Sequence, residues 1–534
     1  MGAEVAVSIL LLAFVCACSP VPGDGSPGKQ DGGLVRDPEV VEDDDDTGDD
    51  TGTDVEPLDW FPCDPDLHLP AAVRCAEVLA PLRWSAPDTS LPISLTLMKI
   101  SATGPPRGQL WMLDGGPGGT GLQLVRDLER YAPLTDAGWT LMVPVHRGTG
   151  ESTALEMALP RTPTHWLDSW IDTYGDDVVG FSATEAADDL AMWLHRSPGP
   201  GANIVWGMSY GSFLAQRFAQ RHDGLVDGIV LDGVLPLDAD IERVHVRADA
   251  PVRAMVALCA ADPSCAAQTG GDPEGVLMAA LDGVEDRRCP VIVGTREDWE
   301  AGFSGTMGSV FAPLVFPLAT MIVRCDADDE TALHTFQDVL GSYQQPQVFN
   351  AGLQVHVTML DLFRPTSTLA EVEAAEDGVL LPGPGPAALY GLQERWAELG
   401  LPDYPRAVGT ISTPVLVLQG ALDPATPPVW AEEVLPDIVA PITTLVTFPY
   451  AGHVSFGFTA SADSSDNCAL DVLLAFAEAP GRAPPTDCVA DTLPPDFGVV
   501  LAATQARSLE LFGTTDPWRT GDGTGAAVAP PASP

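Results

Sequence analysis

The feature that most constrains the fold of this chain is the alternation of short strand-like runs with helix-like runs. Residues 183–196 and 212–221 carry apolar side chains at helical spacing, whereas 204–206 and 229–231 are short apolar runs of the kind that form buried strands. This alternation predicts an α/β fold with a mostly parallel sheet and helices on both faces. The other predicted strands span 93–100, 110–113, 140–145, 415–418 and 443–448, and a further helix spans 122–131.

The alternation stops at about residue 235 and returns at about residue 406. The intervening stretch is rich in helical segments and has a Gly- and Pro-rich break at 380–386. We interpret it as an inserted, largely helical cap domain that packs over the carboxyl ends of the strands, where open α/β sheets bind ligands. The predicted domains are therefore a first part of the core at 57–235, the cap at 236–405, a second part of the core at 406–512 and a disordered tail at 513–534.

The first residues have the features of an export sequence. The apolar run 6–15 is too short to cross a bilayer and has the length of a signal-peptide core. Ala17 directly before Cys18 resembles the cleavage site of bacterial lipoproteins, so 1–18 is predicted to be a lipoprotein-type signal peptide and Cys18 the lipid-carrying residue. The chain is therefore expected to be a cell-envelope lipoprotein, periplasmic or on the outer surface, or a secreted protein.

Residues 19–56 are rich in Gly, Pro and Asp and are predicted to be a disordered acidic linker, because they cannot bury enough apolar surface to offset their ordering entropy. A calcium-binding loop is the alternative for the repeated Asp and Gly residues. Thr47 stands where an EF-hand loop needs a third oxygen-rich Asp or Asn, and no helical segments flank it.

The charge balance excludes one class of function. The chain has 75 acidic and 26 basic residues and a formal net charge of −49. Phosphate backbones and anionic membrane surfaces repel such a protein, so nucleic-acid binding is not expected and a membrane would be reached only through a lipid anchor. The acidity is spread over the whole chain, which favours a role in solubility; selection for cationic substrates is the alternative.

Eight cysteines remain once Cys16 and Cys18 are set aside, an even number that predicts disulfides in an exported chain. Eight cysteines permit about 105 pairings. No spacing among them matches a zinc site, and neither a metal nor a cofactor is predicted. Pairing of sequence neighbours would join Cys63 with Cys75, Cys259 with Cys265, Cys289 with Cys325 and Cys468 with Cys488.

The strongest chemical motif is Gly-Met-Ser-Tyr-Gly at 207–211, placed between the predicted strand 204–206 and the helix that begins near Ser212. A serine on a sharp strand-to-helix turn projects its hydroxyl into the cleft, and glycines two residues away on either side remove Cβ atoms that would collide with the neighbouring strand and helix. The following helix N-terminus favours developing negative charge. Ser209 is therefore predicted to be a nucleophile rather than part of a structural turn.

A nucleophilic serine needs a base, and the base needs a carboxylate to orient it. Asp423 follows the strand 415–418 on a turn, and His453 follows the strand 443–448 on a loop. The order Ser, acid, His is the order of the nucleophile-elbow fold. We therefore predict a catalytic triad of Ser209, Asp423 and His453.

Acyl transfer also needs donors for an oxyanion. The Gly-rich stretch 114–119 follows the strand 110–113 and lets the backbone approach a substrate closely. We assign one donor to the N–H of Gly115 or Gly116 and the other to the N–H of Tyr210, the residue after the nucleophile. The loop 146–152 follows the next strand, and Arg147 within it is predicted to support the structure rather than to contact substrate.

Taken together, the motifs at 115–119, 147–150, 207–211, 420–424 and 452–453 resemble those of the prolyl and tripeptidyl aminopeptidase family of α/β hydrolases. The opening at 75–84 and the segment from Cys468 to Cys488 resemble the exported bacterial tripeptidyl-aminopeptidase-like branch. The resemblance runs from about Cys63 to Phe497 and implies an α/β-hydrolase fold and release of short peptides or single residues from free N-termini. It also implies that acidic residues, often in the cap, hold the substrate ammonium, but no motif selects one.

Three positions depart from the pattern of that family. Asp114 precedes the glycine loop where His or Pro is common, Val145 takes the place of a usual Asp, and Val454 follows His453 where Gly is frequent. None of them belongs to the predicted triad. The predicted activity is a serine exopeptidase; an esterase on small esters and a non-catalytic surface binding protein are the alternatives. The expected partner is a peptide or small ester substrate.

Overall fold

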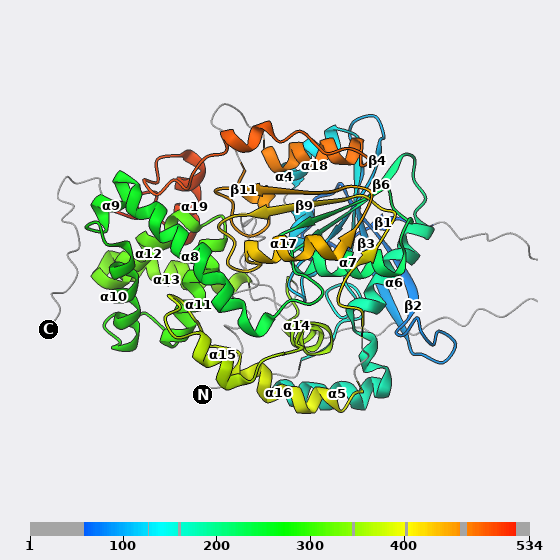
Figure 1. Cartoon of the computed structure of the whole chain (residues 1–534), viewed down its shortest axis with the longest axis horizontal. Coiled ribbons are helices and arrows are strands. Elements are labelled where there is room, and N and C mark those ends of the chain that lie inside the picture. The colour runs from blue at the N-terminus through cyan, green and yellow to red at the C-terminus, as the bar shows by residue number, and fades with distance from the viewer. Residues whose placement is uncertain are drawn as a thin grey trace, which may run out of the picture.

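The computed structural model describes residues 58–519, apart from 127, 158–161, 344–347, 401–403 and 460–466 (Figure 1). The predicted signal peptide, the acidic linker with its alternative calcium loop, and Cys18 lie outside the described residues, as does the tail from residue 520 onward. Among the described helices, none is both long and apolar enough to cross a membrane.

A single large sheet forms the centre of the molecule (Figure 1). Within the described residues its strand order is β1-β2-β3-β5-β4-β6-β7-β9-β11. The first strands pair antiparallel as far as β5, and from β5 to β11 all pairs are parallel. The strands are β1 (Phe61–Pro62), β2 (Val73–Pro81), β3 (Pro92–Ile100), β4 (Gly108–Leu113), β5 (Trp139–Pro144), β6 (Ala202–Met208), β7 (Gly228–Asp232), β9 (Val415–Gly420) and β11 (Thr443–Phe448).

Alternate side chains of the parallel strands enter two different apolar cores, because successive residues of a strand point to opposite faces. On β4, Trp111 packs on one face of the sheet and Met112 on the other. The first face is covered by α6 (Ala183–Arg196), α7 (Tyr210–Arg221) and α17 (Pro428–Val434), and the second by α3 (Leu122–Arg126), α4 (Leu128–Asp136) and α18 (Cys468–Glu478) (Figure 1). The predicted fold class, an α/β-hydrolase fold with a mostly parallel sheet, is confirmed.

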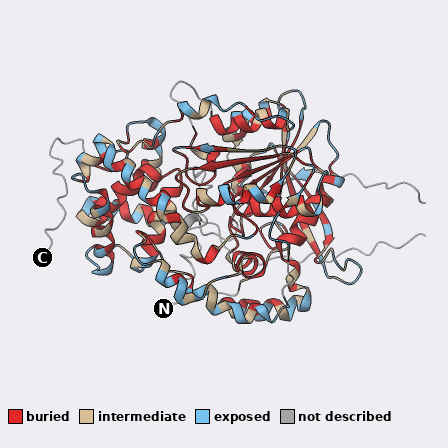
Figure 2. Cartoon of the chain, viewed as in Figure 1, coloured by how far each residue is buried: buried red, intermediate tan, exposed pale blue. Residues whose placement is uncertain are grey.

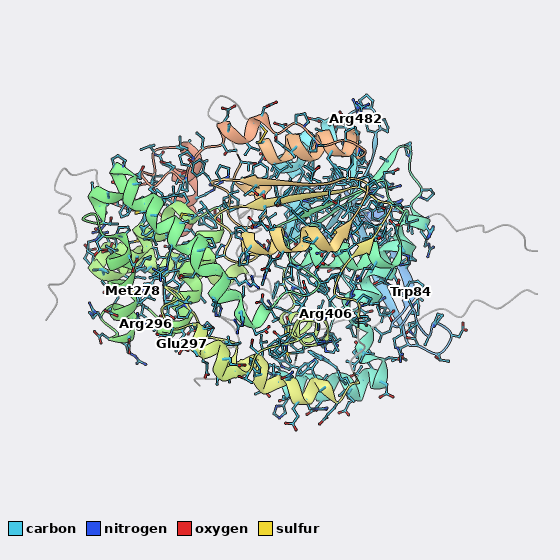
Figure 3. The ribbon with its side chains drawn as sticks, in the orientation of Figure 1. Trp84, Met278, Arg296, Glu297, Arg406 and Arg482 are labelled. Carbon is cyan, nitrogen blue, oxygen red and sulfur yellow. A yellow bond between two sulfur atoms is a disulfide. The ribbon has the colours of Figure 1, made fainter. Side chains whose placement is uncertain are left out.

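The helices between β7 and β9 form two groups. The first group has an apolar core of its own, and Figure 2 shows buried residues running through it as well as through the sheet. An ion pair also joins two of its helices: Arg296, labelled in Figure 3, lies 2.8 Å from Asp282 of the preceding helix. The group comprises α8 (Val244–Ala261), α9 (Pro263–Gln268), α10 (Pro273–Glu285), α11 (Arg296–Gly308), α12 (Val315–Arg324) and α13 (Ala327–Tyr343).

The second group packs against the sheet-side core instead. Leu353 and Trp396 are fully buried in that core, near helix α5 (Pro163–Tyr174). Its elements are α14 (Ala351–Val357), η5 (Thr358–Leu362), α15 (Leu369–Ala375) and α16 (Ala387–Ala397), beside α5.

The end of the described chain departs from the predicted boundaries. Helix α19 (Ala502–Phe512) packs on α13, at the left of Figure 1, and Phe497 and Phe512 are buried in the core of the first inserted group rather than beside the sheet. Trp518 is also buried there, and its indole N–H donates to the carbonyl of Phe497. The predicted second core part therefore ends before this segment, and the chain stays packed beyond residue 513.

Four disulfides staple the described chain. Each joins sequence neighbours, with S–S distances from 1.93 to 2.05 Å. Two lie in the first inserted group, one joins the residue after β1 to β2, and one holds the first residue of α18. The pairs are Cys63–Cys75, Cys259–Cys265, Cys289–Cys325 and Cys468–Cys488.

Candidate active site

The three residues predicted as a triad come together at the carboxyl ends of the parallel strands. Ser209 directly follows β6, Asp423 lies on the turn after β9, and His453 lies on the loop after β11. All three are buried, with exposed fractions of 4%, 0% and 1%. Because these strands are parallel, their carboxyl ends meet at one edge of the sheet, which brings residues more than 200 positions apart into one site.

Ser209 sits in a backbone conformation that side chains rarely adopt, with φ 55° and ψ −125°. The flanking glycines allow this turn. A Cβ on Gly207 would lie 2.2 Å from the carbonyl oxygen of Gly211, and one on Gly211 would lie 2.1 Å from that of Leu113. The predicted reason for these two glycines therefore holds in the structure.

Both carboxylate oxygens of Asp423 accept hydrogen bonds. Its Oδ1 accepts hydrogen bonds from the backbone N–H groups of Ala425 and Thr426, and its Oδ2 accepts one from the Thr426 hydroxyl at 2.7 Å. The same Oδ2 lies 2.8 Å from Nδ1 of His453. A carboxylate oxygen can only accept, so Nδ1 carries the proton and Nε2 is left as the basic nitrogen of His453.

Nε2 of His453 is buried and has no hydrogen-bond partner among the described residues. The structure records no hydrogen bond between it and Ser209, an arrangement common in sites without substrate, where the nucleophile and base align only in the complex. The backbone N–H of His453 donates to the carbonyl of Gly308 at the end of α11, so an inserted helix holds the histidine loop directly.

The glycine-rich loop lies against the serine. A Cβ on Gly115 would be 3.4 Å from Ser209 Oγ. The N–H of Gly115, however, donates to Oδ1 of Asp114 at 2.8 Å, which leaves the N–H of Gly116 as the better oxyanion donor on this loop. Tyr210 is the first residue of α7, so its N–H has no partner in a preceding turn of helix.

In the sequence, Asp114 stands out only as a departure from the family pattern. In the structure its two oxygens accept hydrogen bonds from the N–H groups of Gly115 and Gly121 at 2.8 and 2.9 Å and so connect the two sides of the loop. Burial raises the pKa of its carboxyl, and these two backbone donors lower it. The contact between 114 and 121 is local, so a loop-bracing aspartate could have been recognised from the sequence.

The neighbouring loop supports the site without facing it. Arg147 is fully buried and pairs with Asp189 through Nε and Nη2, as expected for a structural role. His146 lies beside it, and its Nε2 is 3.1 Å from the hydroxyl of Tyr210. Burial lowers the pKa of His146 to about 4, so it is neutral at pH 7.

A pocket opens next to the triad, between the sheet and the inserted helices. Gly116 and Pro117 of the glycine loop line it, together with Pro424 and Ala425 after the acid. The rest of its wall is mostly apolar side chains of η3 (Ile241–Arg243), α8, η5 and α16, among them Ile241, Val244, Leu362, Leu381, Leu389 and Leu392.

One carboxylate stands in this apolar wall. Glu242 is 2% exposed; its Oε1 accepts a hydrogen bond from the N–H of Thr366 at 3.1 Å, and its Oε2 has no partner among the described residues. The sequence has many carboxylates in this region, and only the fold separates the one in the pocket from the others. No cluster of three or more metal-binding side chains occurs in the described part of the chain.

Two family models match the chain. The model of the alpha/beta hydrolase fold matches residues 111–262, and a model described as TAP-like protein matches residues 395–484. The first covers β4 to β7 with the Ser209 turn, and the second covers β9 and β11 with Asp423 and His453. The stretch between them holds α9 to α15 of the inserted region.

Serine protease Hip1 of Mycobacterium tuberculosis is 21% identical over 252 residues, which cover 41% of this chain and 48% of that protein. A probable proline iminopeptidase of Streptomyces coelicolor is 30% identical over 123 residues, or 23% of this chain and 32% of that protein. The chain therefore matches about half or less of the length of these curated relatives. The solved proline iminopeptidase of Mycobacterium smegmatis is 18% identical, covers 71% of this chain and 91% of its own, and has a TM-score of 0.34.

Proposed function

The chain has the α/β-hydrolase fold and resembles the tripeptidyl aminopeptidase family, and from this premise we propose that it is a serine exopeptidase that cleaves peptides from their free N-termini. The observation that carries the proposal is the juxtaposition of Ser209, His453 and Asp423 beside a pocket that holds one carboxylate, Glu242, whose Oε2 has no partner among the described residues.

The proposed chemistry follows from the positions of these groups. Ser209 Oγ attacks the scissile carbonyl while Nε2 of His453 takes its proton, and Asp423 stabilises the imidazolium through Nδ1. The oxyanion is held by the N–H groups of Gly116 and Tyr210. His453 then protonates the leaving amine, and a water molecule activated by the same nitrogen hydrolyses the acyl-enzyme.

Glu242 supports the choice of a free N-terminus as the group recognised. A buried carboxylate with one unpaired oxygen is costly on its own, and a substrate ammonium would supply the missing donor and opposite charge. The apolar wall around it suits apolar N-terminal side chains. The same apolar lining also favours the second candidate, an esterase acting on small acyl esters.

The nucleophile is tested first, with a fluorophosphonate probe on the purified protein. We expect wild type to be labelled and Ser209→Ala to lose labelling, since the probe reacts only with an activated serine. Ser304→Ala, another serine of the pocket wall, is the matched control and keeps labelling. A folded wild-type protein that does not react with the probe contradicts the proposal and favours the binding-protein alternative.

Peptidase and esterase are separated by substrates with and without a free amine. We expect turnover of aminoacyl or tripeptidyl amides, loss of turnover when the amine is acetylated, and an increase in KM of about 10-fold or more for Glu242→Gln on the free-amine substrates alone. Fast cleavage of acyl esters without amide turnover would identify an esterase.

We also propose that the protein is exported and anchored through a lipid on Cys18. The four disulfides support an oxidising compartment, because such bonds are rare in the cytosol. In cells, wild type should fractionate with membranes and Cys18→Ser should not. Equal distribution of the two proteins would contradict the anchor.

A further inference from the structure

One buried side chain outside the triad joins the serine turn to the histidine loop. Asp232 is the last residue of β7, where it pairs in register with Met208 of β6 and Leu418 of β9. It therefore lies between the strand that leads to Ser209 and the strand that leads to Asp423. It is fully buried.

Asp232 uses its backbone and its side chain for different partners. Its carbonyl oxygen accepts the N–H of Ser209 at 2.9 Å, and its Oδ1 accepts the N–H of Ser455 at 2.7 Å. The next residue, Gly233, continues the contact, since a Cβ placed there would lie 3.2 Å from Nδ1 of His453. One short segment of β7 thus touches the nucleophile turn and the base.

The loop that carries His453 must be fixed by its neighbours, because one of its residues has an unfavourable backbone conformation. Val454, between His453 and Ser455, has φ 62°, which a β-branched residue rarely adopts. Strained residues of this kind persist only where their surroundings fix them. On one side the N–H of His453 is bound to Gly308, and on the other the N–H of Ser455 is bound to Asp232.

We infer that Asp232 is a positioning residue, whose carboxyl oxygen fixes the Val454–Ser455 peptide and so holds the imidazole of His453 in register with Ser209. The inference rests on the proposed function and adds to it a residue that no motif marks. Hydrogen-bond acceptance is the property required, so an amide oxygen at this position should serve as well as a carboxylate oxygen.

The charge of Asp232 is not what the loop needs. Its Oδ2 has no hydrogen-bond partner among the described residues, and burial raises the pKa of its carboxyl to about 6. The donors at Ser455 and the nearby imidazole lower that pKa and so offset part of the effect of burial. A carboxylate that acted through its charge would have hydrogen-bond or ion-pair partners for both oxygens.

The test compares Asp232→Asn, which keeps an acceptor oxygen, with Asp232→Leu, which is of similar size and has none. We expect Asp232→Leu to lower kcat and the rate of fluorophosphonate labelling by between about 10-fold and 100-fold, with KM changed less than about 2-fold. Asp232→Asn should restore kcat to within about 3-fold of wild type. Folding of each variant is followed by thermal melting and near-UV circular dichroism.

Asp223→Ala is the matched control. Asp223 also accepts backbone N–H groups from a distant loop, those of Ser412 and Thr413, but it lies before β7, at the opposite end of the same strands. It should cost stability without changing kcat. If Asp232→Leu does not fold, Asp232→Ala takes its place.

The outcomes separate the two proposals. If wild type is labelled and a folded Asp232→Leu or Asp232→Ala has wild-type kcat, the positioning role is wrong while the proposed function stands. The role is also wrong if Asp232→Asn is as slow as the apolar variant, because then acceptance of a hydrogen bond is not what matters. If wild type itself is not labelled, the proposed function fails first.

Discussion

At the scale of single residues, the tautomer of His453 is set by its hydrogen bond to Asp423. The carboxylate is fixed by Thr426 and accepts a hydrogen bond from Nδ1–H, which leaves Nε2 free for Ser209. An asparagine would offer an N–H in place of one oxygen and would favour the opposite tautomer of the imidazole. The base would then face Ser209 with a proton already in place.

We therefore expect Asp423→Asn to lower kcat by about 10³- to 10⁴-fold, with little change in KM because the residue is fully buried and is not itself part of the pocket lining. Steady-state kinetics on an amide substrate measure this. Thr426→Val, which removes one donor to the carboxylate and keeps the size of the side chain, should have a much smaller effect. A loss below about 10-fold for Asp423→Asn would assign the acid elsewhere.

How far the site could be predicted from the sequence depends on the range of the contacts involved. Ser209, Asp423 and His453 each follow a recognisable strand, so local pattern places them at one edge of the sheet. Asp232 ends a strand and Glu242 lies in η3, but what distinguishes them is a distant partner or, among the described residues, the lack of one. Such properties depend on packing between segments far apart in sequence, which no local pattern records.

At the scale of elements, the central parallel strands β4, β6, β7 and β9 were predictable because each has a short apolar run that is buried on both faces of the sheet. Strand β2 was not predicted: Arg74 and Glu77 interrupt its apolar pattern, since it lies in the antiparallel part of the sheet and one of its faces is partly open, where even Leu79 is exposed. The segment 502–512 was assigned to the second core part by its place in the sequence, whereas α19 buries Leu511 and Phe512 in the core of the first inserted group.

The junction between α14 and its neighbours contains a buried histidine that must stay neutral. His356 donates from Nε2 to the carbonyl of Val178 and accepts at Nδ1 from the indole of Trp396. Burial lowers the pKa of His356 from 6.5 to about 4. Protonation would place a second N–H against the indole N–H, so the folded protein binds this proton later than the unfolded chain does.

The sign of the pH effect follows from this order. Above pH 6.5 the histidine is neutral in both states, and as the pH falls toward 4 the unfolded chain takes up the proton first, so stability is lost over that window. A shift of this size corresponds to roughly 3 kcal/mol. We expect His356→Gln to remove that part of the loss, measured as the change in unfolding free energy between pH 7 and pH 4.5. Equal pH slopes for variant and wild type would contradict it.

The segment after α19 closes the core of the first inserted group. Trp518 is buried among its helices and donates to Phe497, although it lies within the stretch predicted to be a disordered tail. Trp518→Ala should therefore destabilise this group by about 3 to 5 kcal/mol, the usual cost of removing a buried tryptophan. Urea unfolding followed by tryptophan fluorescence measures the change. Arg519→Ala, which removes ion pairs with the exposed carboxylates of Asp326 and Asp328 and a longer one, at 3.6 Å, with Asp329, should cost less than about 1 kcal/mol.

At the scale of the whole molecule, the regions matched by the two family models and the inserted helices contribute different parts of the site. The loops after the parallel strands carry Ser209, Asp423 and His453, whereas the inserted region forms most of the pocket wall and supplies Glu242 and the carbonyl of Gly308 that accepts the N–H of His453. On the proposed function, we expect substrate selection and alignment of the base to be coupled through α11. Changes in the inserted region should alter kcat as well as KM.

The net charge of −49 acts on the same scale. A strongly acidic surface raises the local concentration of cations, so a peptide with a free ammonium is attracted over long range, and salt screens this attraction as the Debye length falls from about 10 Å at 0.1 M to about 3 Å at 1 M. We expect kcat/KM for a free-amine substrate to fall several-fold between about 0.02 M and 0.5 M salt, with kcat unchanged. The contact with buried Glu242 is screened far less, so the loss should appear in the rate of substrate capture.

An uncharged ester of similar size, hydrolysed by the same triad, should show no such dependence. If both substrates respond equally, salt acts on the protein itself, and the acidity then serves solubility alone.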